Sequence, residues 1–301
     1  MTAFTKILNS FQPTSFYSTL VKSIFNKKEL FDIATSASQF LKDDMNMLGV
    51  SFIPAPSEEH IIPIIPDSKI VNFPKEYLLP KINRKILKDE YFDVSKLDGI
   101  SDDHARTFIN KMNQVVVNEG QEGTREALTD TLVNHLLTNA LDMDRYPLSI
   151  RFHPLCKLSL FDKSYISAEP EFVVSKRSMA MVVVDDKHIK NVGELTNYGE
   201  TQLACEILAC GNANAMDKIS DQTIFAMRVI SMHVTFYKAV IPKEYWVELY
   251  KGFPKKKSVE IMRWPIKNGK RTGLDLADPG GREKVLKSLV KIRQFVLNHV
   301  Q

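Results

Sequence analysis

The sequence predicts an α/β fold, in which a mixed central sheet is flanked by helices and preceded by a helical N-terminal extension. Three observations carry this prediction. Apolar residues recur at helical spacing over residues 122–141, β-branched runs follow at 172–175 and 179–187, and a second helical stretch occupies 200–209. An amphipathic helix over residues 283–299 closes the series. Helices that alternate with strands in this order favour one sheet with helices on its faces.

The composition is that of a globular protein. The chain has 301 residues, of which 44% are hydrophobic, so a sizeable core is available. No stretch approaches the roughly 20 apolar residues that cross a membrane, and the first ten residues lack the apolar run of a secretory signal. Three cysteines without metal-ligand spacing suggest a reducing compartment. We therefore expect an intracellular protein, cytoplasmic or nuclear, with no membrane partner.

The N-terminal third differs from the rest. Residues 16–25 and 29–47 have the pattern of two amphipathic helices, and residues 51–66 are rich in proline and apolar side chains. Prolines argue against a central strand, so we expect an extended arm that packs on the core or on a partner, including a second copy of the chain. The predicted division is a helical and proline-rich region, 1–105, and an α/β domain, 106–301.

The two β-branched runs predict a hairpin. Residues 172–175 form one strand, a polar break follows, and residues 179–187 form a near-continuous apolar strand, as expected for burial on both faces. Side chains alternate across a strand. Asp185 and Lys187 should therefore share a face, and Asp186 should point away.

Acidic residues border this hairpin. Glu171 precedes the first strand and Asp185 lies near the end of the second, so pairing of the strands brings the two carboxylates together. Two such carboxylates, with water and substrate phosphate oxygens, suit Mg²⁺ or Mn²⁺. Lys187 would add positive charge beside a phosphate or orient a water molecule. The alternative is that these charges mark where buried strands meet solvent.

Two helical residues extend the candidate site. Glu126 lies on the inward stripe that continues through Val133, Leu137 and Ala140, where a carboxylate needs a partner or a metal ion. It could equally be a first-turn acid favoured by the helix dipole. Gln202 opens the later helix and could hold a water molecule or a phosphate oxygen, or occupy an ordinary exposed position.

The C-terminal part predicts further strands. A hairpin is expected over residues 223–240 with its bend near 230–232, and strands at 245–250 and 259–264. Two basic clusters lie in the turns that follow: Lys255, Lys256 and Lys257, and then Lys267, Lys270 and Arg271. With a formal net charge of +4, the chain could contact a polyanion through them. The alternative is that they are solvated turns.

The order of these elements resembles the restriction-endonuclease-like superfamily, PD-(D/E)XK. The series is a helix with Glu126, a strand that starts at Pro170-Glu171, a strand that ends in Asp185-Asp186-Lys187, and a helix opened by Gln202. The resemblance covers residues 122–237. It implies a core of a helix, a mixed sheet and a second helix, with an active site at the strand ends. The chain departs from the pattern in having Glu171 where aspartate is commoner, and Glu206 where some members have tyrosine.

The late segments Tyr245-Trp246-Val247-Glu248 and Asp278-Pro279-Gly280-Gly281-Arg282 are also similar to nuclease-like modules of Crinkler-type proteins.

The resemblance implies a divalent-metal-dependent endonuclease that hydrolyses phosphodiester bonds, with DNA favoured over RNA as substrate. Glu171 and Asp185, with Glu126 as a further ligand, would hold the metal ion; Lys187 and Gln202 would complete the catalytic set. The basic residues Lys255, Lys256, Lys257, Lys270 and Arg271 would contact nucleic acid. The competing hypothesis is a catalytically inactive fold of this kind that binds nucleic acid or protein.

Overall fold

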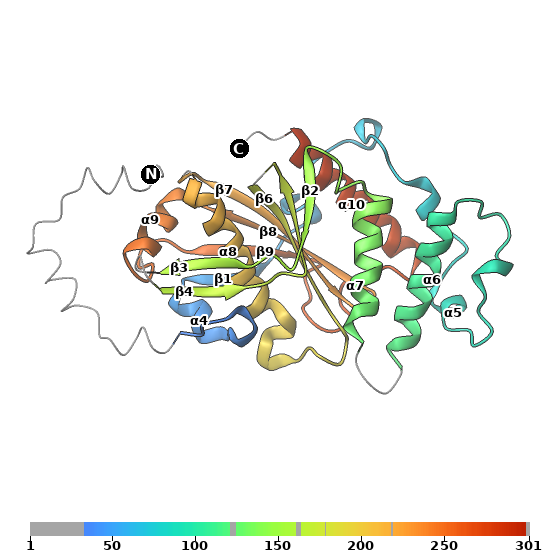
Figure 1. Cartoon of the computed structure of the whole chain (residues 1–301), viewed down its shortest axis with the longest axis horizontal. Coiled ribbons are helices and arrows are strands. Elements are labelled where there is room, and N and C mark those ends of the chain that lie inside the picture. The colour runs from blue at the N-terminus through green and yellow to red at the C-terminus, as the bar shows by residue number, and fades with distance from the viewer. Residues whose placement is uncertain (1–32, 121–124, 161–163, 178, 218, 299–301) are drawn as a thin grey trace, which may run out of the picture.

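A computed structural model describes residues 33–120, 125–160, 164–177, 179–217 and 219–298. A large mixed sheet runs through the molecule with helices on both faces (Figure 1), as the sequence predicts. Its strand order is β1-β9-β8-β7-β6-β5-β2, with β10 paired to β8. The strands are β1 Val50–Pro54, β2 Leu148–Phe152, β5 Phe172–Lys176, β6 Met179–Lys187, β7 Gln222–Ile230, β8 His233–Ile241, β9 Val259–Trp264 and β10 Leu274–Asp275.

The helices and a small second sheet form two outer layers. The helices are α4 Lys42–Met47, α5 Arg84–Leu87, α6 Asp103–Asn118, α7 Glu126–His135, α8 Glu200–Asp217, α9 Lys243–Lys251 and α10 Pro279–Asn298. A two-stranded sheet joins β3 Cys156–Leu160 to β4 Ser164–Ala168. Helices α6, α7 and α10 cover one face, and α4, α8, α9 and the small sheet cover the other (Figure 1).

Alternation along the strands fills both layers of the core. In β6, Val182 and Val184 pack with the α6, α7 and α10 layer, whereas Val183 packs with the α8 layer. A strand buried on both faces needs apolar residues at successive positions. The near-continuous apolar sequence of β6 is explained by this placement.

The sheet topology gathers several strand ends at one edge. Strands β6 and β7 are parallel neighbours joined through α8, β5 is antiparallel to β6, and β8 is antiparallel to β7. The ends of β6 and β7 therefore lie beside the starts of β5 and β8. The register pairs Phe172 with Val184, which confirms the predicted hairpin and places Glu171 next to Asp185.

Most C-terminal expectations are confirmed and one is wrong. The β7–β8 hairpin, strand β9 and helix α10 occupy the predicted segments. Residues 245–250 belong to helix α9, not to a strand. Aromatic enrichment favoured a strand, but Tyr245, Trp246 and Leu249 are buried together at helical spacing against the core.

The N-terminal region is less helical than expected. Residues 16–25 lie outside the described residues. Within the described part of 29–47, only a 3₁₀ turn, Ala37–Gln39, and α4 are helical. The proline-rich segment begins as β1, which pairs in parallel with β9 at the edge of the sheet, where a terminal proline is tolerated.

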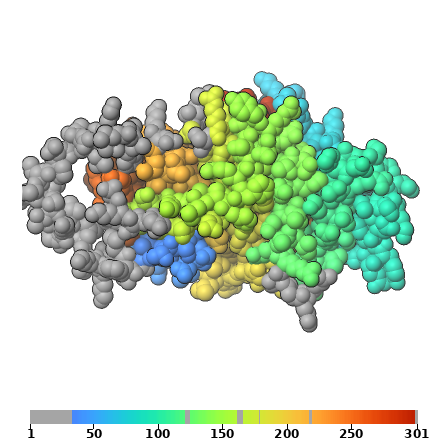
Figure 2. All heavy atoms as spheres, in the orientation of Figure 1, coloured from blue at the N-terminus to red at the C-terminus, as the bar shows by residue number. Residues whose placement is uncertain are grey.

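The segment before α7 covers two separate sides of the molecule. In the space-filling view, the blue residues around α4 lie in the lower left part of the molecule and the teal residues around α5 and α6 lie at its right-hand end (Figure 2). Ile61, Ile62 and Tyr77 share a core cluster with α6 and α7. The predicted division between residues 105 and 106 falls inside α6.

Among the described helices, none has the length and apolar character needed to cross a membrane.

Candidate active site

The ammonium group of Lys187 lies between two carboxylates. Its Nζ is 2.9 Å from Oδ1 of Asp185 and 3.5 Å from Oε1 of Glu171. Asp185 and Lys187 lie on the same face of β6, as alternation predicts, and Glu171 approaches from the start of β5. The sequence separates these residues by up to sixteen positions, and the β5–β6 hairpin brings them together.

Burial controls the charge of this trio. Desolvation alone would lower the pKa of Lys187, but Asp185, Glu206 and Glu171 outweigh it and raise that pKa, so Lys187 is an ammonium at neutral pH. Desolvation raises the pKa of Glu171, and the nearby carboxylates of Asp185 and Asp130 raise it further, while Lys187 acts in the opposite direction. Two carboxyl groups thus share one ammonium in a place where water is scarce.

The donor set fits a hard divalent cation. Asp185 is fully buried, and its Oδ2 atom has no hydrogen-bond partner. Glu171 offers a second carboxylate whose side chain is 19% exposed. Among the described residues, no group of three or more His, Cys, Asp or Glu side chains is arranged to hold a metal ion. Two carboxylates still suit Mg²⁺, which takes its other ligands from water and substrate phosphate.

Helix α8 adds an amide and a third carboxylate. Gln202 is partly buried, so it is not an ordinary exposed helix residue, and its Nε2 donates a 2.8 Å hydrogen bond to Oε1 of Glu206. Glu206 is fully buried and its Oε2 has no partner. Desolvation, followed by the charge of Asp185, raises the pKa of Glu206 well above its usual value. The helical spacing in the sequence placed Gln202 and Glu206 on the same face of the helix, but it did not show that the Glu206 side chain is buried.

Glu126 contacts the loop that follows β6. Its Oε1 accepts hydrogen bonds from Nδ2 of Asn191 at 2.6 Å and from the backbone N–H of His188 at 3.4 Å. No contact recorded among the described residues joins Glu126 to Glu171 or Asp185. These hydrogen bonds hold the loop that follows Lys187 against α7. The metal-ligand role of Glu126 stays a prediction.

Asp130 is the α7 acid that approaches the site. It lies one helical turn after Glu126 and acts on Asp186. Asp186 lies on the opposite face of β6 from Asp185 and Lys187, as predicted, with Val182 and Val184 on the side that α7 covers. Desolvation and Asp130 together raise the pKa of Asp186 well above its usual value, and Asp130 also raises that of Glu171. The i, i+4 spacing from Glu126 was the only sequence signal for Asp130.

His153 was also missed. Its Nδ1 lies 3.1 Å from Oε2 of Glu171, on the side of the carboxylate away from Lys187. The contact arises because β2 ends beside the start of β5, where Phe152 pairs with Phe172. Nothing in the sequence specifies that pairing, so no local pattern could have found His153.

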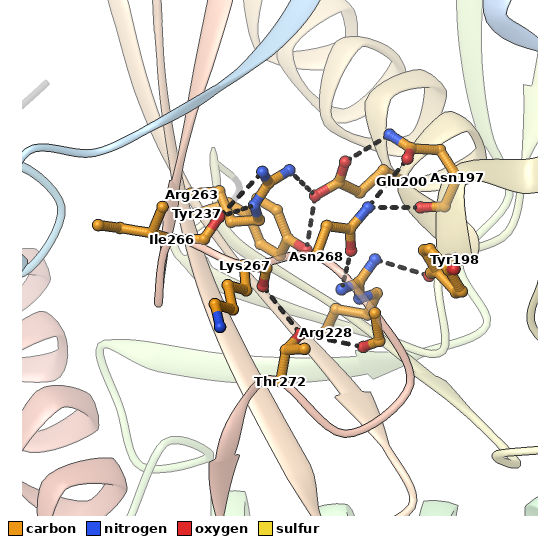
Figure 3. A network of polar contacts seen from close by, with 11 residues as sticks. Asn197, Tyr198, Glu200, Arg228, Tyr237, Arg263, Ile266, Lys267, Asn268 and Thr272 are labelled. Atoms are coloured by element: carbon orange, nitrogen blue, oxygen red, sulfur yellow. Dashed lines mark hydrogen bonds and ion pairs between the residues drawn. The ribbon is translucent and has the colours of Figure 1, made fainter. Parts of the chain in front are cut away.

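A polar network joins the loop before α8 to the loop after β9 (Figure 3). Arg228 is fully buried on β7 and pairs in register with Asp185. Its guanidinium donates to the carbonyl of Tyr198 at 2.6 Å and to Oδ1 of Asn268 at 2.8 Å. Asn268 in turn donates to the carbonyl of Asn197 at 3.0 Å. The loop before α8 is thus fixed to the loop after β9.

The same network satisfies Glu200, the first residue of α8. Arg263 donates to its Oε1 at 2.7 Å, the hydroxyl of Tyr237 donates to the same atom at 3.1 Å, and Nδ2 of Asn197 donates to Oε2 at 2.6 Å (Figure 3). Gly199, with φ +90°, brings this turn against the site. A Cβ atom there would lie 3.7 Å from Oδ2 of Asp185, in a conformation that other residues rarely adopt.

The two basic clusters lie at opposite ends of the sheet. Lys270 and Arg271 follow β9 at the end that carries Lys187, and Arg271 lies 3.8 Å from Glu119. Residues 255–257 precede β9 at the other end, separated by the nine residues of β7, roughly 27 Å. The backbone N–H groups of residues 255–257 donate to Oε2 of Glu248.

No protein-family model matches this chain, and no curated protein matches it significantly.

Proposed function

We propose that this chain is a divalent-metal-dependent nuclease that hydrolyses phosphodiester bonds, with DNA favoured over RNA as substrate. The observation that carries the proposal is the convergence of Glu171 and Asp185 on Lys187 at the end of β6. Buried carboxylates that converge on a cationic partner, one of them with a raised pKa as for Glu171, are typical of functional sites. The order of α7, strands β2, β5 and β6, and helix α8 agrees with the restriction-endonuclease-like resemblance.

Glu171 and Asp185 would hold the cation, Mg²⁺ or Mn²⁺. Such an ion stabilises negative charge on a phosphate and makes water a better nucleophile. The two carboxyl groups approach Lys187 from adjacent strands, and Oδ2 of Asp185 has no hydrogen-bond partner, so a bound ion would supply the interaction that this atom lacks. His153 keeps the Glu171 carboxylate in place from its other side.

Lys187 would stabilise the transition state. Its ammonium remains charged at neutral pH and contacts both carboxylates at the strand end, so a phosphate held there by a metal ion would lie close to it. A fixed positive charge in a poorly solvated site stabilises developing negative charge more than it does in water. Gln202, whose amide is held by Glu206, supports the site from α8.

The substrate backbone would cross the sheet end that holds Lys187. Lys267, Lys270 and Arg271 lie on the loop after β9, and the Asn268 contacts fix this loop to the turn beside Asp185. Cations in that position can contact neighbouring phosphates of the same substrate. Residues 255–257 lie too far along the sheet to contact the phosphate at Lys187.

The second candidate is a catalytically inactive fold that binds nucleic acid or protein. One observation favours it: Lys187 already neutralises part of the carboxylate charge, so the trio is electrostatically tolerable without an ion. In that case the chain would bind nucleic acid with a salt-dependent affinity and leave it intact.

The deciding experiment is cleavage of single-stranded DNA, duplex DNA and RNA by the full chain, with Mg²⁺, with Mn²⁺ and with a chelator. We expect metal-dependent cleavage that is lost in Asp185→Asn. Glu244→Gln, which changes an exposed acid on α9, is the matched control and should retain activity. Binding without cleavage under every metal condition would support the inactive fold.

A further inference from the structure

Two cysteines from different layers of the fold meet in the core. Cys156 begins β3 and Cys210 lies on α8, 54 positions later, yet their Sγ atoms are 3.6 Å apart. Both side chains are buried. A disulfide bond requires an Sγ–Sγ distance of about 2.05 Å, so the sulfurs need to close by on the order of 1.5 Å. Movement of this size lies within side-chain rotation and a small shift of a strand end.

We propose that Cys156 and Cys210 are a dithiol that a peroxide oxidises to a disulfide, which joins β3 to α8. The Cys156 thiolate attacks one oxygen of hydrogen peroxide, breaks the O–O bond and becomes a sulfenic acid, while hydroxide leaves. The Cys210 sulfur then attacks the Cys156 sulfur, the S–O bond breaks, and water leaves with the Cys210 proton. Two thiols lose two electrons in total, and one peroxide is reduced to two water molecules.

The environment makes Cys156 the first residue to react. The hydrogen bond between the two sulfurs is the main cause that lowers the pKa of Cys156, to about 7, whereas the same contact raises the pKa of Cys210. Cys156 therefore has the larger thiolate fraction at neutral pH, and the thiolate is the reactive form. Cys156 also follows Leu155, which is 57% exposed, so a small peroxide has a short path to the start of β3.

The disulfide would enclose most of the candidate active site in one covalent loop. Glu171, Asp185, Lys187 and Gln202 all lie between positions 156 and 210. Cys210 is also one helical turn after Glu206, whose buried carboxyl lies near Asp185. Oxidation would fix α8 to β3 of the small sheet and stabilise this outer layer of the fold. The inference does not rest on the proposed nuclease activity, since it concerns only the two sulfurs.

The test uses the full reduced chain, hydrogen peroxide and thiol counting under denaturing conditions. The chain has three cysteines, and oxidation should leave one free thiol, that of Cys205. The intact mass should fall by about 2 Da, and peptide mapping should find Cys156 linked to Cys210. The midpoint of thermal unfolding should rise by roughly 5–15 °C and return to its starting value after reduction.

Cys205→Ser is the matched control, because Cys205 is buried on the same helix. This variant should still form the disulfide, and Cys210→Ser should instead accumulate oxygen at Cys156. Peptide mapping of the unmodified chain decides the question even if a variant fails to fold. Retention of all three thiols at peroxide levels that oxidise exposed methionines, or a disulfide that includes Cys205, would overturn the proposal.

Discussion

Replacement of Lys187 with methionine tests the electrostatic core of the candidate site. Methionine keeps most of the aliphatic stem and removes the charge. In an effective dielectric constant of about 20, a contact at 2.9 Å and one at 3.5 Å each represent on the order of 5 kcal/mol of attraction. Desolvation of the ammonium offsets much of this. Removal of one partner of a buried pair costs about 3–5 kcal/mol, because the other charge stays buried.

We therefore expect Lys187→Met to lower the free energy of unfolding at pH 7 by about 3–5 kcal/mol, as measured by urea denaturation. Lys287→Met is the matched control: Lys287 lies 3.1 Å from Glu283, but its side chain is 36% exposed. An exposed pair contributes about 0–1 kcal/mol, so this control should remain close to the parent.

A double-mutant cycle identifies the partner. If Asp185 is the charge left unpaired, Asp185→Asn in the Lys187→Met background should recover about 2–3 kcal/mol, the upper part of the range of about 0.5–3 kcal/mol over which contacting residues couple. On the proposed function, folded Lys187→Met should also cleave nucleic acid about 10²–10³-fold more slowly. A loss of less than about 1 kcal/mol with additive single changes would refute this account of the trio.

Three further outcomes are expected. Calorimetry with Mn²⁺ should detect binding to the native chain that Asp185→Asn loses, and equal affinity in both proteins would reject the carboxylate pair as a metal site. Changing Lys270 and Arg271 to glutamine should reduce the salt dependence of DNA binding by about one unit of slope for each lost phosphate contact, and the same change at 255–257 should reduce it less. Burial lowers the pKa of His233 below 6.5, so the folded state resists its protonation and loses stability as the pH falls from above 6.5 towards that lowered pKa. His233→Gln should therefore have a flatter stability profile in acid denaturation, and an unchanged profile would assign the acid sensitivity to other groups.

Local patterns predicted the part of the fold that local forces determine. The β5–β6 hairpin followed from two apolar runs and a polar break, and alternation then fixed which side chains of β6 share a face. The trio of Glu171, Asp185 and Lys187 could be proposed because one hairpin contains all three residues. Helix α9 was missed because aromatic residues favour strands, whereas in this segment burial at helical spacing against the core decided the outcome.

Contacts between distant elements could not be predicted in this way. His153 meets Glu171 only because β2 pairs with β5, and Arg228 lies beside Asp185 only because β6 and β7 are parallel neighbours in register. The approach of Asp130 to Asp186 and Glu171 depends on how α7 packs across the sheet. Each of these contacts is determined by strand order and register, which a single sequence does not specify beyond the nearest hairpin.

The two groups of buried charge at this end of the sheet differ in how well they are satisfied. Glu200 is fully buried, but three donors reach its carboxylate, as a structural ion-pair network requires (Figure 3). Asp185 and Glu206 are equally buried, yet Oδ2 of one and Oε2 of the other have no partner. A buried polar atom without a hydrogen bond lowers the stability of the fold, and a well-packed apolar residue in its place would lower it less. Glu200 shows that a buried carboxylate at this end of the sheet can have all the hydrogen-bond donors it needs. The missing partner of Asp185 Oδ2 is therefore specific to the position of Asp185. That contrast is the strongest argument for looking for a ligand at Asp185 and a structural role at Glu200.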